Sequence, residues 1–512
     1  MPPAALRRGV LSTDAYQLTM AQLYLRMGLH ERRVRFEHFF RSNPDYGGHA
    51  AGFCVAAGLG PFTRWMTTVR ARPQDVDALR THRTRHGGRL FDETFCEWFA
   101  SVDFSGLRVA AVPEGRVVHP NTPITVVDGP LGTAQLIETP LLNQLNFATL
   151  IATKATRVVE AAGGRPVLEF GMRRAPSTGA DTASRAAIVG GAVATSNSAV
   201  AYELGRTPSG THAHSMIQLF IALGEGEQAA FDAYADVYPD DTLLLLDTVD
   251  TLGSGLPNAI RTFERLRSGG HTPVGVRLDS GDLAFLSVAV GVELDRAGFP
   301  NASIVLTSRL DEMAIWQITS QIVDEAARAG VDADAIIGRL VFGVGSSLAT
   351  SDGDPSLDGV YKLVAVDDRT GGWAPAIKRS DSAVKVLNPG AKRVWRAYDQ
   401  RGMATADVLS GATEVLAPGS HHLTHHARRE VARWVEIDAV EELLVPLVDG
   451  GDVIADGGVD GLDDVDAAGR RRRADIDRLD PGVRRLVSPH AYHVSITDEV
   501  LQLKQRLLAE LA

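Results

Sequence analysis

The spacing of apolar residues predicts a helix near the start of the chain. Ser12 and Thr13 are good helix-capping residues, and apolar positions recur with the helical period from there to about Gly28. The apolar face of this helix comprises Tyr16, Met20, Leu23 and Met27. Because Met and aromatic residues at this spacing usually pack in a core, we predict that the face is buried.

Strand patterns follow this helix. Residues 34–40 alternate between apolar and polar positions, which predicts a strand, and 107–127 has the pattern of a β-meander with Pro- and Gly-containing turns. Residues 133–162 then predict a helix, interrupted by Pro140 and closed by a pair of glycines. This part of the chain therefore mixes helices and strands.

From residue 166 onward the pattern changes to short apolar runs about 30 to 40 residues apart, with helices or Gly-rich turns between most of them. This alternation is typical of βα units and of a parallel sheet, closed or open. Polar and charged residues gather just past the strand ends, where ligands bind in parallel α/β folds. The predicted strands lie at 166–170, 243–247, 273–279, 303–307 and 340–344.

Composition narrows the class of protein. The chain has 512 residues, enough for two or three domains, and 45% of them are hydrophobic, as in globular proteins. A net charge of −11 argues against binding to nucleic acid. We expect a cytoplasmic location, since no long apolar run predicts a membrane span and the start lacks an apolar signal region. The two cysteines, Cys54 and Cys96, are predicted to be reduced.

Three segments carry candidate chemistry. Residues 277–283 read Arg-Leu-Asp-Ser-Gly-Asp-Leu, and their two carboxylates could bind ribose hydroxyls or a metal. A structural interpretation is equally favoured, in which Asp282 caps the following helix and Arg277 forms a salt bridge. Residues 343–347, Gly-Val-Gly-Ser-Ser, could cradle a phosphate with backbone N–H groups. In Ser-Gly-Thr-His-Ala-His-Ser at 209–215, a catalytic or structural histidine is favoured over a metal ligand, and a neutral imidazole can attack phosphorus.

Together these segments resemble nicotinate phosphoribosyltransferase in their identity, order and spacing, over essentially the whole chain. No single motif is specific for this family, but the joint order of the motifs is. The matching segments are 12–20, 169–175, 209–214, 247–250, 277–283, 343–345, 359–363 and 488–494.

The resemblance implies an α/β fold with an irregular (β/α) barrel. It implies an N-terminal α+β domain at 1–130, to which C-terminal segments return, and a barrel phosphoribosyltransferase domain at 131–360. A C-terminal extension would occupy 361–512, and its acidic, Gly-rich stretch at 449–468 is predicted to be a surface linker.

The resemblance also implies an ATP-coupled enzyme that condenses nicotinate with 5-phosphoribosyl 1-pyrophosphate, giving nicotinate mononucleotide and pyrophosphate. It implies a phosphohistidine intermediate, Mg²⁺ bound with the phosphates rather than by a protein motif, and a homodimer with shared active sites. This reaction would be the first step of NAD biosynthesis from nicotinate.

By match to the family motifs, Asp279 would hold the ribose hydroxyls, Arg277 would neutralise phosphate charge and His214 would be phosphorylated. The resemblance assigns substrate contacts to seven other residues. Tyr16 would stack on the nicotinate ring, Arg173 and Thr211 would lie at the substrate, Gly343, Gly345 and Ser346 would form the phosphate loop, and Ser196 would face the nicotinate carboxylate.

Two positions depart from the family pattern. Ser346 replaces a common Thr and preserves its hydroxyl, whereas Arg309 stands where Asp is usual, which could alter phosphate affinity. Lys154, Arg157, Lys385 and Lys392 also match family positions, with only weak grounds for phosphate roles.

We weigh four alternatives. They are nicotinamide phosphoribosyltransferase, a quinolinate enzyme, a catalytically impaired relative that only binds, and a barrel glycosidase that would use Asp279 and Asp282 as its carboxylate pair. The last three are disfavoured: the quinolinate enzymes are much shorter chains, the binding relative would not need the retained site residues, and the glycosidase pair has phosphate-type Gly and Arg neighbours.

Overall fold

The computed structural model describes residues 9–379, 386–428, 430–455 and 458–511. Contacts divide the chain into two units. The first unit comprises Met1–Thr153 and Asp354–Ala512, and the second comprises Lys154–Gly353. The domain boundaries expected near residues 130 and 360 stay predictions.

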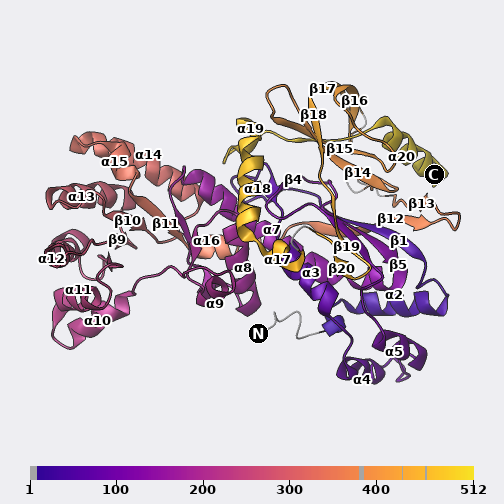
Figure 1. Cartoon of the computed structure of the whole chain (residues 1–512), viewed down its shortest axis with the longest axis horizontal. Helices are drawn as coiled ribbons and strands as arrows, with labels where there is room; N and C mark the ends of the chain where they lie inside the picture. The colour runs from indigo at the N-terminus through magenta and orange to yellow at the C-terminus, as the bar shows by residue number, and fades with distance from the viewer. Residues whose placement is uncertain (1–8, 380–385, 429, 456–457, 512) are drawn as a thin grey trace. The chain divides into compact units, whose positions relative to one another are not determined.

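The first unit contains a seven-stranded sheet that joins distant parts of the sequence. Its strand order is β13-β12-β1-β5-β3-β19-β20. The predicted strand at 34–40 is confirmed as β1 (Arg33–Phe40), which pairs antiparallel with both β5 (Thr125–Pro130) and β12 (Gly359–Asp367). In Figure 1 the indigo β1 and the orange β12 accordingly lie side by side.

The predicted meander is correct in its strands but not in their pairing. β3 (Arg108–Ala111) pairs directly with β5, whereas β4 (Val117–Val118) pairs with β2 (Cys54–Val55) in a separate small sheet. The helical stretch that follows consists of α6 (Leu131–Leu136) and α7 (Glu138–Ala161). Pro140 does not interrupt α7, because it lies in the first turn, where the missing N–H costs no helical hydrogen bond.

The predicted burial of the first apolar helix face is wrong. The helix is α2 (Ala15–Arg26), and Tyr16, Leu23 and Met27 on that face are 50 to 65% exposed. Its buried residues are instead Gln17, Leu18 and Ala21. Gln17 bonds to Glu138 and accepts from Gln135, so a polar network anchors the helix. The apolar face is therefore left uncovered by the described part of the chain.

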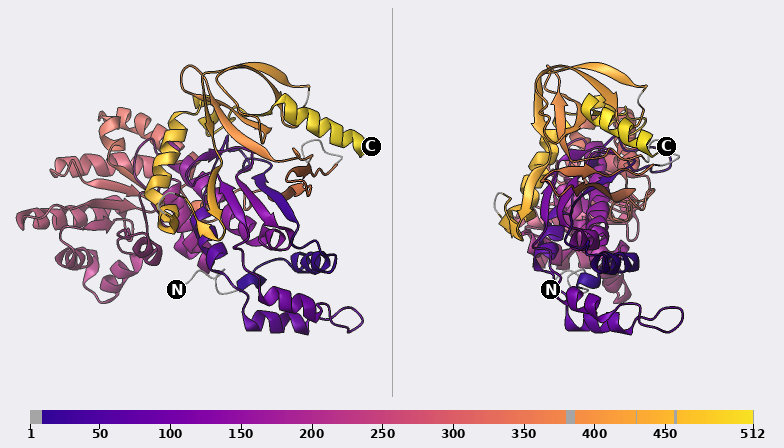
Figure 2. Two further views of the ribbon diagram at one scale, coloured as in Figure 1. Left: turned by 45° about the vertical axis from the view of Figure 1, so that its right-hand side comes forward. Right: turned by 90° about the vertical axis from the view of Figure 1, so that its right-hand side faces the viewer.

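The C-terminal strands predicted beyond Tyr361 are confirmed. β14 (Lys392–Tyr398), β15 (Ala404–Gly411), β16 (Gly419–His425), β17 (Ala432–Ile437), β18 (Ala439–Glu442) and β21 (His493–Ile496) form a second sheet. The predicted last helix is α20 (Asp498–Glu510), which packs on β15 and β16 (Figure 2).

The acidic stretch at 449–468 contains more regular structure than the expected linker. It includes β20 (Asp452–Val453), α17 (Gly458–Asp463) and the start of α18 (Val465–Asp477). Asp463 forms an ion pair with Arg64, so side chains of this segment also carry tertiary contacts.

The second unit is a parallel α/β structure, and all five predicted strands are confirmed. They are β6 (Val167–Glu169), β8 (Leu243–Leu245), β9 (Gly275–Leu278), β10 (Ser303–Leu306) and β11 (Leu340–Val344). The sheet order is β7-β6-β11-β10-β9-β8, and every pair is parallel. The two-residue β7 (Ala194–Thr195), too short to give a sequence pattern, completes it.

The α/β class is thus confirmed, while closure into a barrel is not seen. Within the described residues, the edge strands β7 and β8 pair only with β6 and β9. Helices such as α12 (Leu256–Ser268), α13 (Leu283–Arg296) and α14 (Glu312–Ala329) lie between the strands in sequence. Because the strands are parallel, their carboxyl ends lie along one edge.

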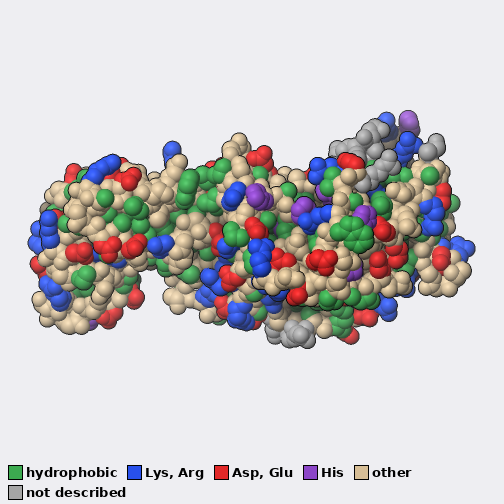
Figure 3. Space-filling view, turned by 90° about the horizontal axis from the view of Figure 1, so that it is seen from above, with side chains coloured by type: hydrophobic (Ala, Val, Ile, Leu, Met, Phe, Trp, Pro, Cys, Tyr) green, Lys and Arg blue, Asp and Glu red, His purple; other side chains and the backbone are tan. Residues whose placement is uncertain are grey.

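No helix in the described ranges is long and apolar enough to cross a membrane. On the face visible in Figure 3, Lys and Arg side chains are interspersed with Asp and Glu.

Candidate active site

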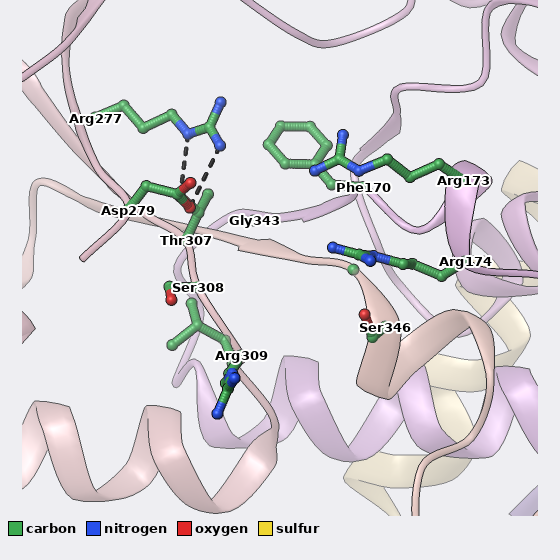
Figure 4. A pocket seen from close by; sticks show the side chains of 12 residues that line it. Phe170, Arg173, Arg174, Arg277, Asp279, Thr307, Ser308, Arg309, Gly343 and Ser346 are labelled. Carbon is green, nitrogen blue, oxygen red and sulfur yellow. Dashed lines mark hydrogen bonds and ion pairs between the residues drawn. The ribbon is translucent and has the colours of Figure 1, made fainter. Parts of the chain in front are cut away.

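A cavity of about 390 Å³ opens in the second unit at the carboxyl ends of its strands. Arginine side chains reach it from several directions, together with one carboxylate (Figure 4). The lining residues are Phe170, Arg173, Arg174, Arg277, Asp279, Thr307, Ser308, Arg309, Leu310, Gly343, Gly345 and Ser346. Four guanidinium groups against one carboxylate make this a strong site for an anion such as phosphate.

Arg173 and Arg174 lie on a short turn that a buried carboxylate holds in place. The turn, η2 (Met172–Arg174), follows β6, whose last residue Glu169 is buried. Glu169 accepts from the Gly171 N–H and, at 2.9 and 2.5 Å, from the hydroxyls of Ser184 and Thr195. The buried Glu169 carboxylate thus holds the backbone that carries both arginines.

Glycine is required where strands β6 and β11 end close together. A Cβ on Gly171 would lie 2.3 Å from the Ala349 Cβ. A Cβ on Gly343 would lie 2.7 Å from both the Phe170 ring and the Thr307 methyl. The Gly-x-Gly segment therefore allows close backbone approach at the cavity floor, and Ser346 begins the short helix α16 (Ser346–Ala349) beside it.

Arg277 and Asp279 both face the cavity from the end of β9. The Arg277 Nη2 atom lies 3.4 Å from Asp279 Oδ1, and Asp279 is 29% exposed. Asp282, in contrast, caps α13 by accepting from Ala284 and Phe285 N–H groups. The capping alternative for Asp282 is confirmed, which removes the second carboxylate that a glycosidase pair would need.

The loop after β10 enters the cavity in an unfavourable backbone conformation. Ser308 and Arg309 have φ values of 87° and 47°, in the left-handed region that side-chain-bearing residues rarely adopt. Such strain is typical of functional sites, where the surrounding structure holds it in place. Arg309 lines the cavity from this loop, and in Figure 4 its side chain extends away from Arg277 and Asp279.

His214 lies beside the Asp279 carboxylate. It is the first residue of α10 (His214–Ala222), and its Nε2 lies 3.7 Å from Asp279 Oδ2 and 4.0 Å from Asp247 Oδ1. On the other side of the ring, Nδ1 lies 3.0 Å from Thr248 Oγ1. Ser280 donates to Asp247 at 2.5 Å. A partly exposed imidazole is thus held between a hydroxyl and two carboxylates.

The neighbouring His212 has a different environment. Its Nε2 accepts from the Leu245 N–H at 3.2 Å, and its ring contacts Tyr234 at a centroid distance of 5.0 Å. Burial lowers the pKa of His212 to about 4, so the ring is neutral near pH 7. These contacts make His212 a structural residue and leave His214 as the accessible imidazole.

Three predicted substrate residues do not line the cavity. Ser196 lies between β7 and α9 (Ser198–Glu203), and its N–H donates to the Glu169 carbonyl. The Thr211 hydroxyl is buried and finds no hydrogen-bond partner within the described residues. Tyr16 lies on α2 of the first unit, whereas the residues that line the cavity belong to the second.

The basic residues with proposed phosphate roles are held in buried ion pairs. Lys154 and Arg157 flank Glu312 at 2.8 and 3.0 Å. Burial alone would raise the pKa of Glu312, but attraction by both cations outweighs it and holds this pKa at about 2. Lys392 pairs with Glu37 at 3.0 Å. Lys385 lies outside the described residues.

Sequence reasoning missed several residues of this site. The cavity also contains Phe170, Thr307, Ser308 and Leu310, while Thr248 contacts His214. These residues lie at or just past the ends of predicted strands, and that position at the ligand-binding edge was the available signal.

Metal binding finds no support from the side chains alone. Within the described ranges, no group of three or more His, Cys, Asp or Glu side chains could hold a metal ion.

Fold and cavity together define a parallel α/β protein with an arginine-rich anion site at the carboxyl edge of its sheet. Comparison with known proteins then gives the family. Residues 11–146 match the nicotinate phosphoribosyltransferase N-terminal domain, and 391–504 match the C-terminal domain. A nicotinate phosphoribosyltransferase of Mycobacterium tuberculosis is 36% identical over 98% of this chain and 94% of its own length. The chain therefore belongs to the nicotinate phosphoribosyltransferase family.

Other relatives agree. The Bacillus subtilis nicotinate phosphoribosyltransferase is 39% identical over 76% of this chain and 73% of its own length. The crystal structure of the human nicotinic acid phosphoribosyltransferase superposes with a TM-score of 0.78 at 30% identity, covering 97% of this chain and 99% of that one. A nicotinate-nucleotide pyrophosphorylase from Pyrococcus furiosus, 22% identical with a TM-score of 0.63 over 91% of this chain and 96% of its own, shows the same fold.

Proposed function

We propose that this protein is a nicotinate phosphoribosyltransferase that condenses nicotinate with 5-phosphoribosyl 1-pyrophosphate, in the synthesis of NAD from nicotinate. The proposal rests on the composition of the cavity lining. Among the described residues of this lining, Asp279 is the one carboxylate, and the four arginines are Arg173, Arg174, Arg277 and Arg309. The sugar substrate carries a 5′-phosphate and a pyrophosphate, so it needs several cations. It also needs a carboxylate that stabilises positive charge near the ribose.

In the proposed reaction the pyridine nitrogen attacks the anomeric carbon of the ribose. A C–N bond forms as the bond from that carbon to the pyrophosphate oxygen breaks, and pyrophosphate leaves with the electron pair. The transition state carries oxocarbenium character, which the Asp279 carboxylate stabilises while also accepting from ribose hydroxyls. Arg277 and the neighbouring arginines neutralise the negative charge that grows on the leaving group.

ATP coupling through His214 is the second part of the proposal. The His214 Nε2 lone pair would attack the terminal phosphorus of ATP, ADP would leave, and hydrolysis of the P–N bond would later release phosphate. Nε2 is the ring nitrogen that faces the cavity carboxylate, 3.7 Å from Asp279 Oδ2. The anchored ring of His212 supports the choice of His214.

Mg²⁺ enters the proposal only as a companion of the phosphates. The carboxylates of Asp247 and Asp279 near His214 are of the type that Mg²⁺ accepts, but a site with phosphate oxygens and waters needs only one or two protein carboxylates. When bound, the ion would neutralise phosphate charge.

We propose a homodimer because apolar helix faces are uncovered in both units. Tyr16, Leu23 and Met27 of α2 are exposed, and in the helix α10 only Ile217 is buried. Such contiguous apolar faces mark protein interfaces, and a second copy of the chain is the partner that the family resemblance implies. Tyr16 would then stack on the nicotinate bound by the other subunit.

One assay tests the reaction and its alternatives. Purified protein is incubated with 5-phosphoribosyl 1-pyrophosphate and ring-labelled nicotinate, nicotinamide or quinolinate, with and without ATP. We expect labelled nicotinate mononucleotide and equimolar pyrophosphate, with ATP increasing the yield. Preferred use of nicotinamide would favour the related amide enzyme. Substrate binding without pyrophosphate release would identify a catalytically impaired relative.

A further inference from the structure

The Thr307 hydroxyl links the two charged residues that the proposed function uses at the ribose and the phosphates. Arg277 Nε–H donates to Thr307 Oγ1 at 3.0 Å, and the same hydroxyl donates to Asp279 Oδ1. Figure 4 shows the three side chains gathered at one wall of the cavity. Thr307 itself is 3% exposed, so water does not compete for these bonds.

The direction of the Thr307 proton follows from its neighbours. An arginine N–H can only donate, so a lone pair of Thr307 Oγ1 must face Arg277. The hydroxyl has a single proton and two acceptors, Asp279 Oδ1 and the more distant Leu278 carbonyl at 3.2 Å. The charged and closer acceptor wins, because hydrogen bonds to a carboxylate are stronger than those to a neutral carbonyl.

The Thr307 side chain is also locked in rotation. Its methyl group lies against Gly343, where an added Cβ would approach it to 2.7 Å. Its backbone N–H donates to the Leu278 carbonyl at 2.9 Å, which continues the pairing of β9 and β10. Because the methyl and the backbone are both fixed, the Thr307 side chain is restricted to one χ1 rotamer, which places the hydroxyl between Arg277 and Asp279.

The alternative arrangement of these charges would be unproductive. Arg277 Nη2 is already 3.4 Å from Asp279 Oδ1. Without a hydroxyl between them, the guanidinium and the carboxylate would close into a bidentate ion pair, the geometry that Arg and carboxylates favour. Both groups would then be turned toward each other and away from the substrate.

We propose that Thr307 is a positioning residue that limits Arg277 and Asp279 to one long ion-pair contact and aims each at the substrate. It engages Asp279 Oδ1, which leaves Oδ2, the oxygen 3.7 Å from His214 Nε2, directed at the reacting centre. This inference rests on the proposed function, and it assigns to Thr307 a role that acts through the two charged residues.

The test compares variants that separate the hydroxyl from the methyl group. Thr307→Val keeps the shape and removes the hydroxyl, and Thr307→Ser keeps the hydroxyl and removes the methyl. Thr319→Val is the matched control, because the Thr319 hydroxyl only bonds within its own helix, to the Ile315 carbonyl. Initial rates of nicotinate mononucleotide formation give kcat and KM for 5-phosphoribosyl 1-pyrophosphate, with melting temperatures alongside.

We expect Thr307→Val to lower kcat roughly tenfold to a hundredfold, the scale of a small misplacement of a reacting group, with a smaller change in KM. Thr307→Ser should recover most of kcat, and Thr319→Val should match the wild type. In the double variant Thr307→Val with Asp279→Asn, kcat should be no lower than in Asp279→Asn alone, because without the Asp279 carboxylate Arg277 has no ion pair to close into and the hydroxyl has none to prevent.

Wild-type kcat in Thr307→Val, or losses that multiply in the double variant, would overturn the inference. If Thr307→Val does not fold, Thr307→Ala and Thr307→Ser replace it, since both lack the methyl and only Ser keeps the hydroxyl. Equal kcat in these two variants would then refute the role of Thr307. Absence of product from the wild type would instead refute the proposed function.

Discussion

His214 Nδ1 lies 3.0 Å from Thr248 Oγ1, which leaves Nε2 as the ring nitrogen that faces the Asp279 carboxylate. A hydrogen bond at one ring nitrogen sets the orientation of the imidazole and selects the other nitrogen for chemistry. In His214 the partner of Thr248 is Nδ1, which leaves Nε2 available. In His212 the opposite nitrogen is occupied, because Nε2 accepts from the Leu245 N–H. The two neighbouring histidines consequently differ in availability.

This geometry predicts phosphorylation at His214 Nε2. Incubation with γ-labelled ATP should give an acid-labile, base-stable phosphate, and ³¹P NMR should identify the Nε2 isomer. His214→Ala should lose the label, while His212→Gln, which keeps an acceptor for the Leu245 N–H, should retain it. Labelling of His214→Ala together with loss in His212→Gln would reverse the assignment.

The sequence predicted the parallel strands of the second unit and the cluster at their ends because both are local patterns. Short apolar runs and the residues that follow them were sufficient to place Arg277, Asp279 and Gly343 on one edge. The role of Thr307 was not predicted because it depends on which strands become neighbours, and no single segment of the sequence specifies the strand order β6-β11-β10-β9.

The exposed face of α2 could not be predicted for a related reason. A helical stripe that contains Tyr16, Leu23 and Met27 indicates an apolar face, but it does not say whether the same chain or another molecule covers it. The acidic stretch at 449–468 likewise looked like a linker by composition. Its ordered elements depend on distant partners such as Arg64.

Asp279→Asn should reduce turnover more than substrate affinity. The substitution keeps the shape of the side chain and removes the charge that the oxocarbenium-like transition state needs, so kcat should fall by roughly a hundredfold or more. KM for 5-phosphoribosyl 1-pyrophosphate should change much less. Steady-state kinetics measure both constants, and an unchanged kcat would exclude Asp279 from the mechanism.

Stability should fall as the pH drops from about 6.5 toward 4. Burial lowers the pKa of both His38 and His212 to about 4, whereas an unfolded histidine titrates near 6.5. Between pH 6.5 and 4 these histidines bind protons in the unfolded chain but not in the folded chain. The free energy of unfolding therefore decreases as the pH falls through this window, and the titration of these two residues does not affect it above the window.

Thermal melts from pH 7.5 to 4 measure this slope. His212→Gln cannot take up a proton, so its melting temperature should depend less on pH between 6.5 and 4 than that of the wild type. Identical pH dependence in both proteins would contradict a contribution from His212.

Mixed dimers should reveal whether the active site is shared between subunits. Tyr16→Ala and Asp279→Asn chains are each expected to retain little activity. If Tyr16 serves the partner's site, a hybrid dimer contains one site without either defect, and mixing should restore up to about a quarter of wild-type activity for random exchange at equal amounts. Exchange is followed with differently tagged chains. Demonstrated exchange without any recovery would argue against sharing.

Selectivity for nicotinate over nicotinamide is predicted to depend on Ser196. This residue follows the edge strand β7, with its N–H tied to the Glu169 carbonyl, so its position is fixed by the same buried network that holds Gly171. A serine hydroxyl can donate to the nicotinate carboxylate, whereas an aspartate would repel it and could accept from an amide NH₂.

Ser196→Asp should therefore weaken the use of nicotinate by about 1 to 3 kcal/mol in transition-state binding, the usual scale for an unpaired buried polar contact. The quantity to compare is the ratio of kcat/KM for nicotinate and nicotinamide in the wild type and the variant. Ser196→Ala is the matched control, because it removes the hydroxyl without adding charge and should cause the smaller change. An unchanged ratio in Ser196→Asp would show that carboxylate recognition resides elsewhere, since a new negative charge at the ring carboxylate could not be silent.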